Sequence, residues 1–381
     1  MESCSNQQSV TETKLAKPVC ECCRESEIEA RRIQRREFLT AAGGVVLGAT
    51  AIGGLLPAGR VWAQVKAPEG AAVAAAGPAA ATSSPESLVK VLFETLSPKQ
   101  RENICFGWDH QDKERGLMRT HVANNWDITE YFINDDNFYT KDQQKIVRGI
   151  FEGIINPEWH SRIDKQLADD SDGYGEQNSI AIFGTPGSEK FEFVMTGRHM
   201  TIRCDGNSAD HVAFGGPIFY GHAAEGFDES PQHKGNIFWP QAEAANKLYT
   251  MLDGKQQQQA LLKSGLPAEQ KVGFRGKGGD FQGLPASELT SDQKEHLQKV
   301  LALLVEPYRQ SDRDEVTQCL KAQGGLDDCH LVYYAENDIG KDGVWDNWRL
   351  EGPSFVWHYR GAPHVHVWVN VADDPSVMLN V

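Results

Sequence analysis

The chain has little positive charge for its length. Its 381 residues include 38 Lys and Arg against 53 Asp and Glu, which gives a formal net charge of −15 at pH 7. A nucleic-acid backbone attracts the opposite charge, and the sequence contains no basic patch or nucleic-acid motif, so we exclude this class of partner. No glycine-rich phosphate loop joins a predicted strand to a predicted helix, and no serine lies at a nucleophile elbow. The sequence therefore supports neither nucleotide binding nor serine-dependent hydrolysis.

Long apolar runs are scarce as well. The run over residues 41–56 is rich in Gly and Ala and is shorter than the roughly 20 apolar residues that a membrane-spanning helix needs. Arg35-Arg36 and Phe38-Leu39 precede this run, and Val61-Trp62-Ala63 after it forms a small-x-small cleavage pattern. This order of regions predicts a signal peptide over residues 1–63, and the paired arginines resemble the twin-arginine class.

The predicted signal determines where we expect the protein to act. The twin-arginine export machinery would be a partner, and the mature protein, beginning near Gln64, would be periplasmic or secreted without a stable membrane span. This pathway carries folded proteins, including proteins that take up a metal before export, so it raises the expectation of a bound metal. An uncleaved anchor or an ordinary buried helix is the alternative interpretation.

The cysteines divide evenly between the predicted signal peptide and the rest of the chain. The first four are Cys4, Cys20, Cys22 and Cys23, and we assign them no role in the mature protein. The other four are Cys105, Cys204, Cys319 and Cys329. The Cys319–Cys329 pair is the nearest, and an oxidising compartment would permit a bridge between them. Free buried thiols are equally compatible, because sequence spacing does not fix disulfide geometry.

A recurring pattern marks the starts of helices after an Ala/Gly/Pro-rich linker at residues 64–84. Ser, Thr or Asp followed three residues later by Gln forms a capping box, and it occurs at Ser97, Thr140, Thr290 and, in a looser form, Asp253. The matches are compatible with an old duplication, but we interpret them as good helix starts. Apolar spacing then predicts helices near 86–96, 141–155, 240–251, 255–263, 291–306 and 312–322.

Apolar residues alternate with a period of two in the segments between and after these helices. The predicted strands are Ser179–Phe183, Phe191–Thr196, His199–Cys204, Leu331–Ala335, Trp348–Leu350, Ser354–Tyr359 and His364–Val371. Helices are segregated from strands, so we predict an α+β fold with an antiparallel sheet. We expect residues 85–381 to form one domain that ends in a β-hairpin carrying a histidine cluster.

The last hairpin carries the strongest chemical signal. His364 and His366 are two residues apart on a predicted strand and therefore face the same way. A three-residue loop at Gly361-Ala362-Pro363 would place Arg360 opposite His364 and His358 opposite His366. Three neutral imidazoles near one point bind zinc or another divalent metal such as copper or iron, with an open position for water or substrate.

The alternatives to a metal site concern the same histidines. Histidines in a His-x-His strand are often only exposed or hydrogen-bonded, and a one-residue slip of register would move His358 to the other face. Arg360 beside the cluster disfavours a cation unless it binds an anionic substrate. His199 is the next candidate, as a fourth metal ligand or a proton donor. His222 and His110 rank lower because they lie in loop-like contexts.

Short motifs in the same order resemble the secreted proteins grouped as domain-of-unknown-function 3500, over roughly residues 88–371. The motifs are Gln143 in its capping box, Gly197-Arg198-His199, Phe219-Tyr220-Gly221, Trp348 to Pro353, and His364-Val365-His366-Val367-Trp368. The resemblance implies that His199, His364 and His366 occupy motif positions, and that His358 stands where the family has an acidic residue. It implies no activity, and the tail with Asn370, Asp373 and Asp374 departs from the family pattern.

Three functions are consistent with these patterns. The first is an exported metal-dependent enzyme, hydrolytic with zinc or oxidative with copper or iron, in which His199 and Arg349 are the predicted catalytic residues. The second is a non-catalytic protein that binds a metal or small ligand, with a pocket lined by Trp345, Trp348, Trp357 and Trp368. In the third, the histidines are structural only.

Overall fold

The computed structural model describes residues 84–188, 190–223, 233, 235–339 and 344–377. The predicted signal peptide and almost all of the predicted linker lie outside these residues, so both stay predictions, as does the predicted domain boundary. Residues 82–381 form one compact unit. Within the described residues, no helix has the length and apolarity that crossing a membrane would require.

The described part of the chain has an α+β fold, as predicted, with a mostly antiparallel sheet of 11 strands. Six of its helices lie where the sequence predicts them. The helices are α2 (Pro85–Thr95), α3 (Pro98–Ile104), α4 (Lys141–Ile154), α5 (His160–Ser171), α6 (Trp239–Met251), α7 (Gly254–Ala260), α8 (Ser291–Val305) and α9 (Gln310–Gln323). Helices α3 and α5 were not predicted, although the capping box at Ser97 marks the start of α3.

The sheet runs in the order β1-β4-β5-β6-β7-β13-β12-β11-β10-β8, and β9 also pairs with β10. Its strands are β1 (Cys105–Phe106), β4 (Asn178–Gly184), β5 (Phe191–Gly197), β6 (Met200–Cys204), β7 (Ile218–His222), β8 (Leu261–Leu262), β9 (Leu284–Pro285), β10 (His330–Tyr334), β11 (Asn347–Gly352), β12 (Phe355–Arg360) and β13 (Val365–Val371). Strands β2 (Gln111–Asp112) and β3 (Gly116–Leu117) form a separate small ribbon. Strand β7, which the sequence analysis missed, joins the two halves of the sheet.

The four capping boxes are present and interact in pairs. Gln100 and Gln143 each bond the backbone N–H of their own cap residue, Ser97 and Thr140, and also bond each other, with Gln100 Nε2 2.9 Å from Gln143 Oε1. Gln256 and Gln293 repeat this arrangement, with Gln293 Nε2 2.9 Å from Gln256 Oε1. Each pair of amides therefore links two helix starts.

The two halves of the fold repeat the same order of elements. Two helices and a short strand (α2, α3, β1 or α6, α7, β8) lead to two further helices and then four antiparallel strands. The short strand pairs in parallel with the first of the four, β1 with β4 and β8 with β10. All four boxes start helices, as we interpreted them, and the repeated order of elements is also compatible with an old duplication.

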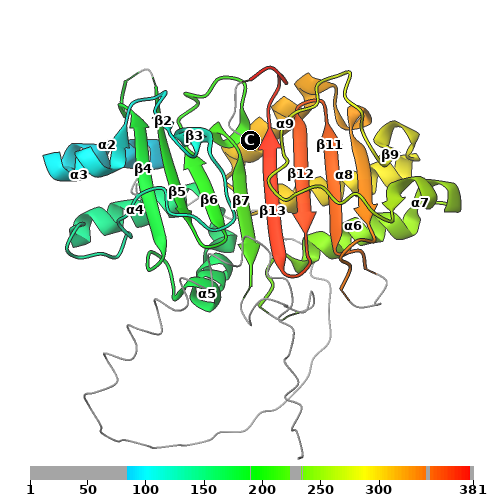
Figure 1. Ribbon diagram of the computed structural model, residues 1–381, viewed down its shortest axis with the longest axis horizontal. Coiled ribbons are helices and arrows are strands. Elements are labelled where there is room, and N and C mark those ends of the chain that lie inside the picture. Colours follow the sequence, from blue (N-terminus) through cyan, green and yellow to red (C-terminus); the bar gives the residue numbers. More distant parts are fainter. Residues whose placement is uncertain (1–83, 189, 224–232, 234, 340–343, 378–381) are drawn as a thin grey trace, which may run out of the picture. The chain divides into compact units, whose positions relative to one another are not determined.

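The two faces of the sheet differ in character. In β13, Val365, Val367 and Val369 belong to the main hydrophobic core that the helices cover, as predicted, so His366 and Trp368 face the other side. Figure 1 shows α6, α8 and α9 behind the sheet, while the loop from α7 to β9 crosses in front of β13, β12 and β11. Polar side chains gather on this loop-covered face.

The expected hairpin register is wrong by two residues, because Arg360 pairs with His366, and His358 pairs with Trp368. Pro363 lacks an N–H and cannot extend the ladder, so the loop is longer than three residues. A shift by two preserves the face of each side chain.

Cys319 and Cys329 are both free thiols. The disulfide that the sequence permitted between them is therefore absent, and the alternative of free buried thiols applies.

Candidate metal centre

His199 occupies the tight turn between β5 and β6. Its backbone has a φ of +53°, a left-handed conformation that is uncommon for residues other than glycine. Two hydrogen bonds hold this conformation: His199 N donates to Asn124 O at 3.0 Å, and Gly221 N donates to His199 O at 3.1 Å. The turn therefore directs the imidazole across β7 toward β13.

Gly221 makes room for that imidazole. It lies opposite His366 in the β7–β13 ladder, so it separates the two histidines in space. A Cβ at this position would lie 3.1 Å from His199 Cδ2 and 2.3 Å from Val365 O. Only glycine lets the His199 ring reach His366 over the strand.

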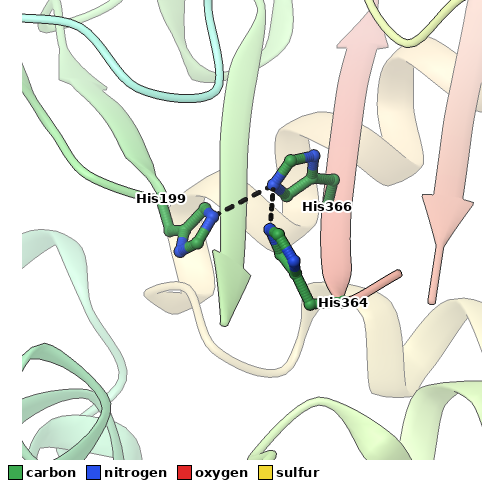
Figure 2. Close-up of side chains that lie close together, drawn as sticks. All are labelled: His199, His364 and His366. Atoms are coloured by element: carbon green, nitrogen blue, oxygen red, sulfur yellow. Dashed lines mark hydrogen bonds between the residues drawn. The ribbon is translucent and has the colours of Figure 1, made fainter. Parts of the chain in front are cut away.

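Three imidazoles meet at this point (Figure 2). His199 Nε2 lies 3.0 Å from His366 Nε2, and His364 Nε2 lies 2.9 Å from the same atom. His366 projects from β13, whereas His364 lies in the loop just before that strand. All three side chains are buried, and their ligand atoms lie within 4.8 Å of one another. Among the described residues, this is the group whose spacing suits a metal ion.

Carboxylates hold the far nitrogens of two of the rings. His199 Nδ1 bonds Asp170 Oδ2, and His366 Nδ1 lies 2.6 Å from Glu269 Oε2. Asp170 comes from the end of α5 and also bonds Arg198 Nε at 2.8 Å. Glu269 comes from the loop that covers the sheet. Such carboxylates fix the tautomer that carries hydrogen on Nδ1 and directs the Nε2 lone pair toward a metal.

Both carboxylates are ionised at neutral pH. Burial alone would raise the pKa of Asp170, but His199 and Arg198 outweigh it and hold the pKa well below its usual range. Burial likewise opposes ionisation of Glu269, yet His366, Arg360 and His358 lower its pKa to about 2. Burial lowers the pKa of His199, an effect that Asp170 only partly offsets. A neutral His199 ring keeps a lone pair free to bind a metal.

The distances between the Nε2 atoms constrain what lies between them. If His199 and His366 both carry hydrogen on Nδ1, their Nε2 lone pairs face each other at 3.0 Å, which is unfavourable without a positive charge between them. Two nitrogens on one tetrahedral zinc, each about 2.0–2.1 Å from the ion, lie about 3.3 Å apart. The arrangement is therefore close to that of a metal centre, and a shared proton is the other way to relieve the repulsion.

The structure brings together His199, His364 and His366 but places His358 elsewhere. His358 is on the face of His366, yet it lies opposite Trp368 in β13 and Arg349 in β11 and does not belong to the cluster. Burial, with Arg349 and Arg360, holds the pKa of His358 well below its usual value. Arg349 is buried beside it and donates from Nη2 to Lys271 O at 2.7 Å.

Other predicted candidates lie apart from the cluster. The ring of His110 contacts Phe106, with 4.8 Å between ring centroids. His222 ends β7 on the helix-covered face and lies near His233, with centroids 6.0 Å apart. Arg360, which we expected to disfavour a cation, instead lies 3.6 Å from Glu269 Oε1, so this carboxylate balances its charge.

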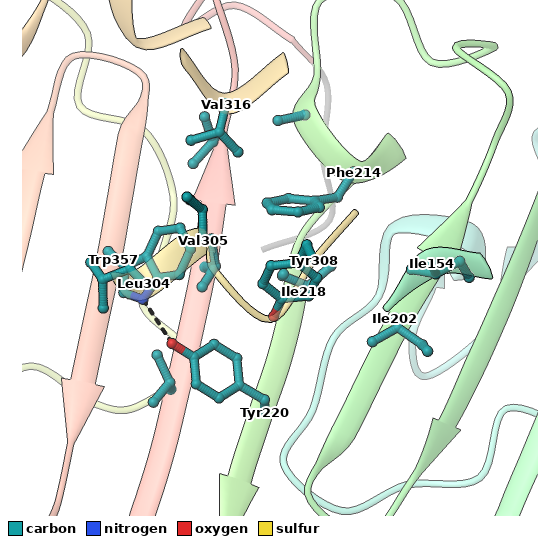
Figure 3. Close-up of a cluster of buried hydrophobic side chains, with 14 of the residues drawn as sticks. Ile154, Ile202, Phe214, Ile218, Tyr220, Leu304, Val305, Tyr308, Val316 and Trp357 are labelled. Atoms are coloured by element: carbon teal, nitrogen blue, oxygen red, sulfur yellow. Dashed lines mark hydrogen bonds between the residues drawn. The ribbon is translucent and has the colours of Figure 1, made fainter. Parts of the chain in front are cut away.

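The predicted tryptophan pocket does not form as expected. Trp357 donates to Tyr220 Oη at 3.1 Å inside the main core (Figure 3), and Trp348 is in the same core. Trp345 packs beside Tyr249, with centroids 6.0 Å apart. Trp368 lies on the loop-covered face, where Phe219 contacts both it and His366.

Sequence reasoning missed the two carboxylates and Gly221. Asp170 is 29 residues from His199, and Glu269 is 97 residues from His366, so no local pattern links them. Glu269 lies in a segment without predicted structure. Gly221 could be noticed only within the Phe219-Tyr220-Gly221 motif, because its role depends on the pairing of β7 with β13.

Comparisons with known proteins place the chain in a family without giving it an activity. No curated protein and no solved structure matches it. One family, described as protein of unknown function (DUF3500), matches residues 79–371. This range covers most of the chain, including β5–β7, β13 and every residue of the histidine cluster. The chain therefore belongs to the DUF3500 family.

Proposed function

We propose that the protein is an exported metal-dependent enzyme whose divalent metal ion is held by His199, His364 and His366. The observation that carries this proposal is the meeting of three Nε2 atoms, two of them 2.9 and 3.0 Å from the third. Buried carboxylates on His199 and His366 support it, because they orient each imidazole for metal binding.

Three protein ligands favour catalysis over storage. Within the described residues the cluster contains three histidines, and a catalytic zinc site characteristically has three protein ligands and an open fourth position. A divalent metal at such a position polarises a substrate oxygen or lowers the pKa of water to about 7. Zinc is the first expectation for three imidazoles, while copper or iron would direct the site toward oxidative chemistry.

The proposed location rests on the sequence alone. The paired arginines at Arg35-Arg36, the apolar run after them and the cleavage pattern at Val61-Trp62-Ala63 support export of a folded chain. A metal bound before export would cross the membrane inside the folded protein. We therefore place the mature protein in the periplasm or outside the cell.

The proposal is tested by the metal content of the mature protein purified after native export. Elemental mass spectrometry should find about one divalent metal per chain in the wild type. The His364→Ala/His366→Ala double variant should lose it. His296→Ala is the matched control, because His296 is a partly buried histidine that bonds Ala244 O outside the cluster, and it should keep the metal.

Two outcomes would count against the proposal. A folded wild type without stoichiometric metal would mean that a shared proton relieves the lone-pair repulsion and that the histidines are structural. A metal with four protein ligands and no exchangeable water would favour the non-catalytic binding protein. Water proton relaxation with Mn²⁺ or Co²⁺ in the site distinguishes the second case, because it detects an exchangeable water.

A further inference from the structure

Unpartnered polar atoms gather on the loop-covered face beside the histidine cluster. Among the described residues, eight buried side-chain atoms without a hydrogen-bond partner belong to residues of β11, β12 and β13 on this face. They are Asn347 Oδ1, Arg349 Nε and Nη1, His358 Nδ1 and Nε2, Arg360 Nε, Trp368 Nε1 and Asn370 Oδ1. Their concentration in one place suggests a missing common partner, since buried polar groups are almost always hydrogen-bonded.

The three central residues form a straight row across the strands. Arg349 lies opposite His358, and His358 lies opposite Trp368. Neighbouring strands are about 4.8 Å apart, and side chains at paired positions point to the same face. The unpartnered atoms of the row can therefore converge on one small group.

Donors outnumber acceptors in this row. Arg349 offers N–H groups from Nε and Nη1, Trp368 offers its indole N–H, and neutral His358 offers one N–H. Asn347 Oδ1 and Asn370 Oδ1 are acceptors on either side of the row, because Asn347 Nδ2 donates to Glu336 O at 3.1 Å and Asn370 Nδ2 donates to Val272 O at 2.9 Å. A partner rich in acceptor oxygens satisfies this set better than a neutral hydroxyl group does.

The surroundings add selectivity for a small ligand. Phe219, Val272 and Val356 form an apolar cluster with Trp368, so apolar side chains border the donors. The segment from Glu269 to Arg275 covers the row: Lys271 O accepts from Arg349 Nη2, and Arg275 Nε donates to Glu351 at 2.8 Å. Arg349 Nη2 lies 3.2 Å from Glu351 Oε1, so Glu351 already offsets part of the Arg349 charge. An enclosed anion would bind Nε and Nη1, the buried guanidinium nitrogens without a partner, where water screens the interaction little.

We propose that Arg349, His358 and Trp368 bind an oxyanion, a carboxylate or a phosphate group, beside the metal centre. Trp368 and His366 are two residues apart on β13 and share a face, so the anion lies about 7 Å along the strand from the metal ligand. If the proposed metal-dependent activity is correct, on which this step rests, the substrate is a small acid. Its anionic group would bind the row while a second oxygen of the same molecule would reach the metal.

Anion binding is tested first on the mature protein after removal of metal by a chelator. Sodium acetate and inorganic phosphate are titrated separately by calorimetry, with sodium chloride at equal ionic strength as the reference. We expect saturable binding of at least one oxyanion, and the preferred anion distinguishes a carboxylate site from a phosphate site. The same titrations after metal loading should show tighter binding, because the ion adds positive charge nearby.

Two variants and a matched control complete the test. Trp368→Phe removes one unpartnered indole N–H and should weaken anion binding about tenfold. Arg349→Gln should weaken it further. Trp348→Phe is the control, because the Trp348 indole N–H is also buried and unpartnered among the described residues but lies in the main core, and it should leave binding unchanged.

The outcomes separate this proposal from the metal proposal. No saturable binding of either anion, or equal weakening by Trp368→Phe and Trp348→Phe, would overturn the anion site even if the protein holds a metal. Saturable binding that Trp368→Phe selectively weakens would support it even in a protein that binds no metal. Circular dichroism of each variant establishes that a loss of binding does not reflect a loss of folding.

Discussion

The imidazole of His199 lies directly against Gly221, where a Cβ would come within 3.1 Å of the ring and 2.3 Å of the Val365 carbonyl oxygen. This contact joins the β5–β6 turn to β13 across the middle strand of the sheet. It is the reason that a residue far from the C-terminal hairpin reaches the His-x-His pair.

Replacing Gly221 with Ala should damage both stability and the histidine cluster. The new methyl group would meet backbone as well as the His199 ring, and crowding of this kind costs about 1–3 kcal/mol. We expect a lower urea midpoint and weaker metal binding in a competition titration with a chromogenic chelator. Gly107→Ala is the control, because a Cβ there meets nothing within 4 Å. Equal metal affinity in Gly221→Ala and wild type would contradict this account of the contact.

Replacing Asp170 with Asn should weaken metal binding while preserving the shape of the site. The amide oxygen can still accept from His199 Nδ1, but the negative charge that makes the imidazole a better ligand is lost. Removal of a carboxylate that hydrogen-bonds a metal-binding histidine typically lowers metal affinity by about 10–100-fold. Asp169→Asn is the matched control, because Asp169 is the neighbouring carboxylate and pairs with Lys165 on the same helix. If both variants bind metal equally well, Asp170 does not support the site.

The contribution of Glu269 to the stability of the metal-free protein should depend on pH. Its pKa is about 2 in the folded protein, against an ordinary value of 4.5. A lowered carboxyl pKa contributes stability that is complete above about pH 4.5 and is lost as the pH falls toward 2. His199 acts in the same direction from a higher pH, because its pKa is also lowered, from 6.5.

Chemical denaturation of wild type and Glu269→Gln at two pH values measures this contribution. The difference in unfolding free energy should be smaller at pH 3.5 than at pH 7 by about 1.4 kcal/mol, given about 1.4 kcal/mol per pKa unit. Glu295→Gln is the control, an exposed carboxylate paired with Lys299 on its own helix, and its effect should be small at both pH values. A pH-independent difference for Glu269→Gln would mean that Glu269 is not held ionised by His366 and Arg360.

The two halves of the fold should respond alike to loss of the paired amides. Gln143 bonds Thr140 N and Thr95 O as well as Gln100, and Gln293 bonds Thr290 N and Met251 O as well as Gln256. Each change to Ala leaves buried polar groups without a partner, which costs about 1–3 kcal/mol. Thermal unfolding should show a similar loss for both variants and almost none for exposed Gln298→Ala. A large loss in one half alone would contradict the equivalence of the two networks.

Local signals made much of the fold predictable. The capping boxes at Ser97, Thr140, Asp253 and Thr290 specify helix starts through contacts within four residues, and all four are present. Alternation in the segment from His364 to Val371 identified both the core face and the histidine face of β13. A cap signal alone did not decide which helices were predicted, because α6 and α9 were predicted without a side-chain cap and α3 was missed with a capping box.

The site was only partly predictable, because its assembly depends on contacts between distant residues. His-x-His is visible in the sequence, and His199 stands out in Gly197-Arg198-His199. The hairpin register, however, depends on the conformation of the loop around Pro363. The contact of His199 with His366 depends on Gly221, which lies in a strand that the sequence did not reveal. The Asp170 and Glu269 contacts likewise follow from tertiary packing.

The most direct test of the central claim is X-ray absorption spectroscopy at the edge of the metal found in the mature protein. The account predicts three imidazole nitrogens and at least one exchangeable oxygen around the ion, at about 2.0–2.1 Å for zinc, with nitrogen scattering reduced in His199→Ala. An unchanged coordination shell in that variant, or a shell of sulfur or carboxylate ligands in the wild type, would show that the metal lies elsewhere and would contradict the proposed centre.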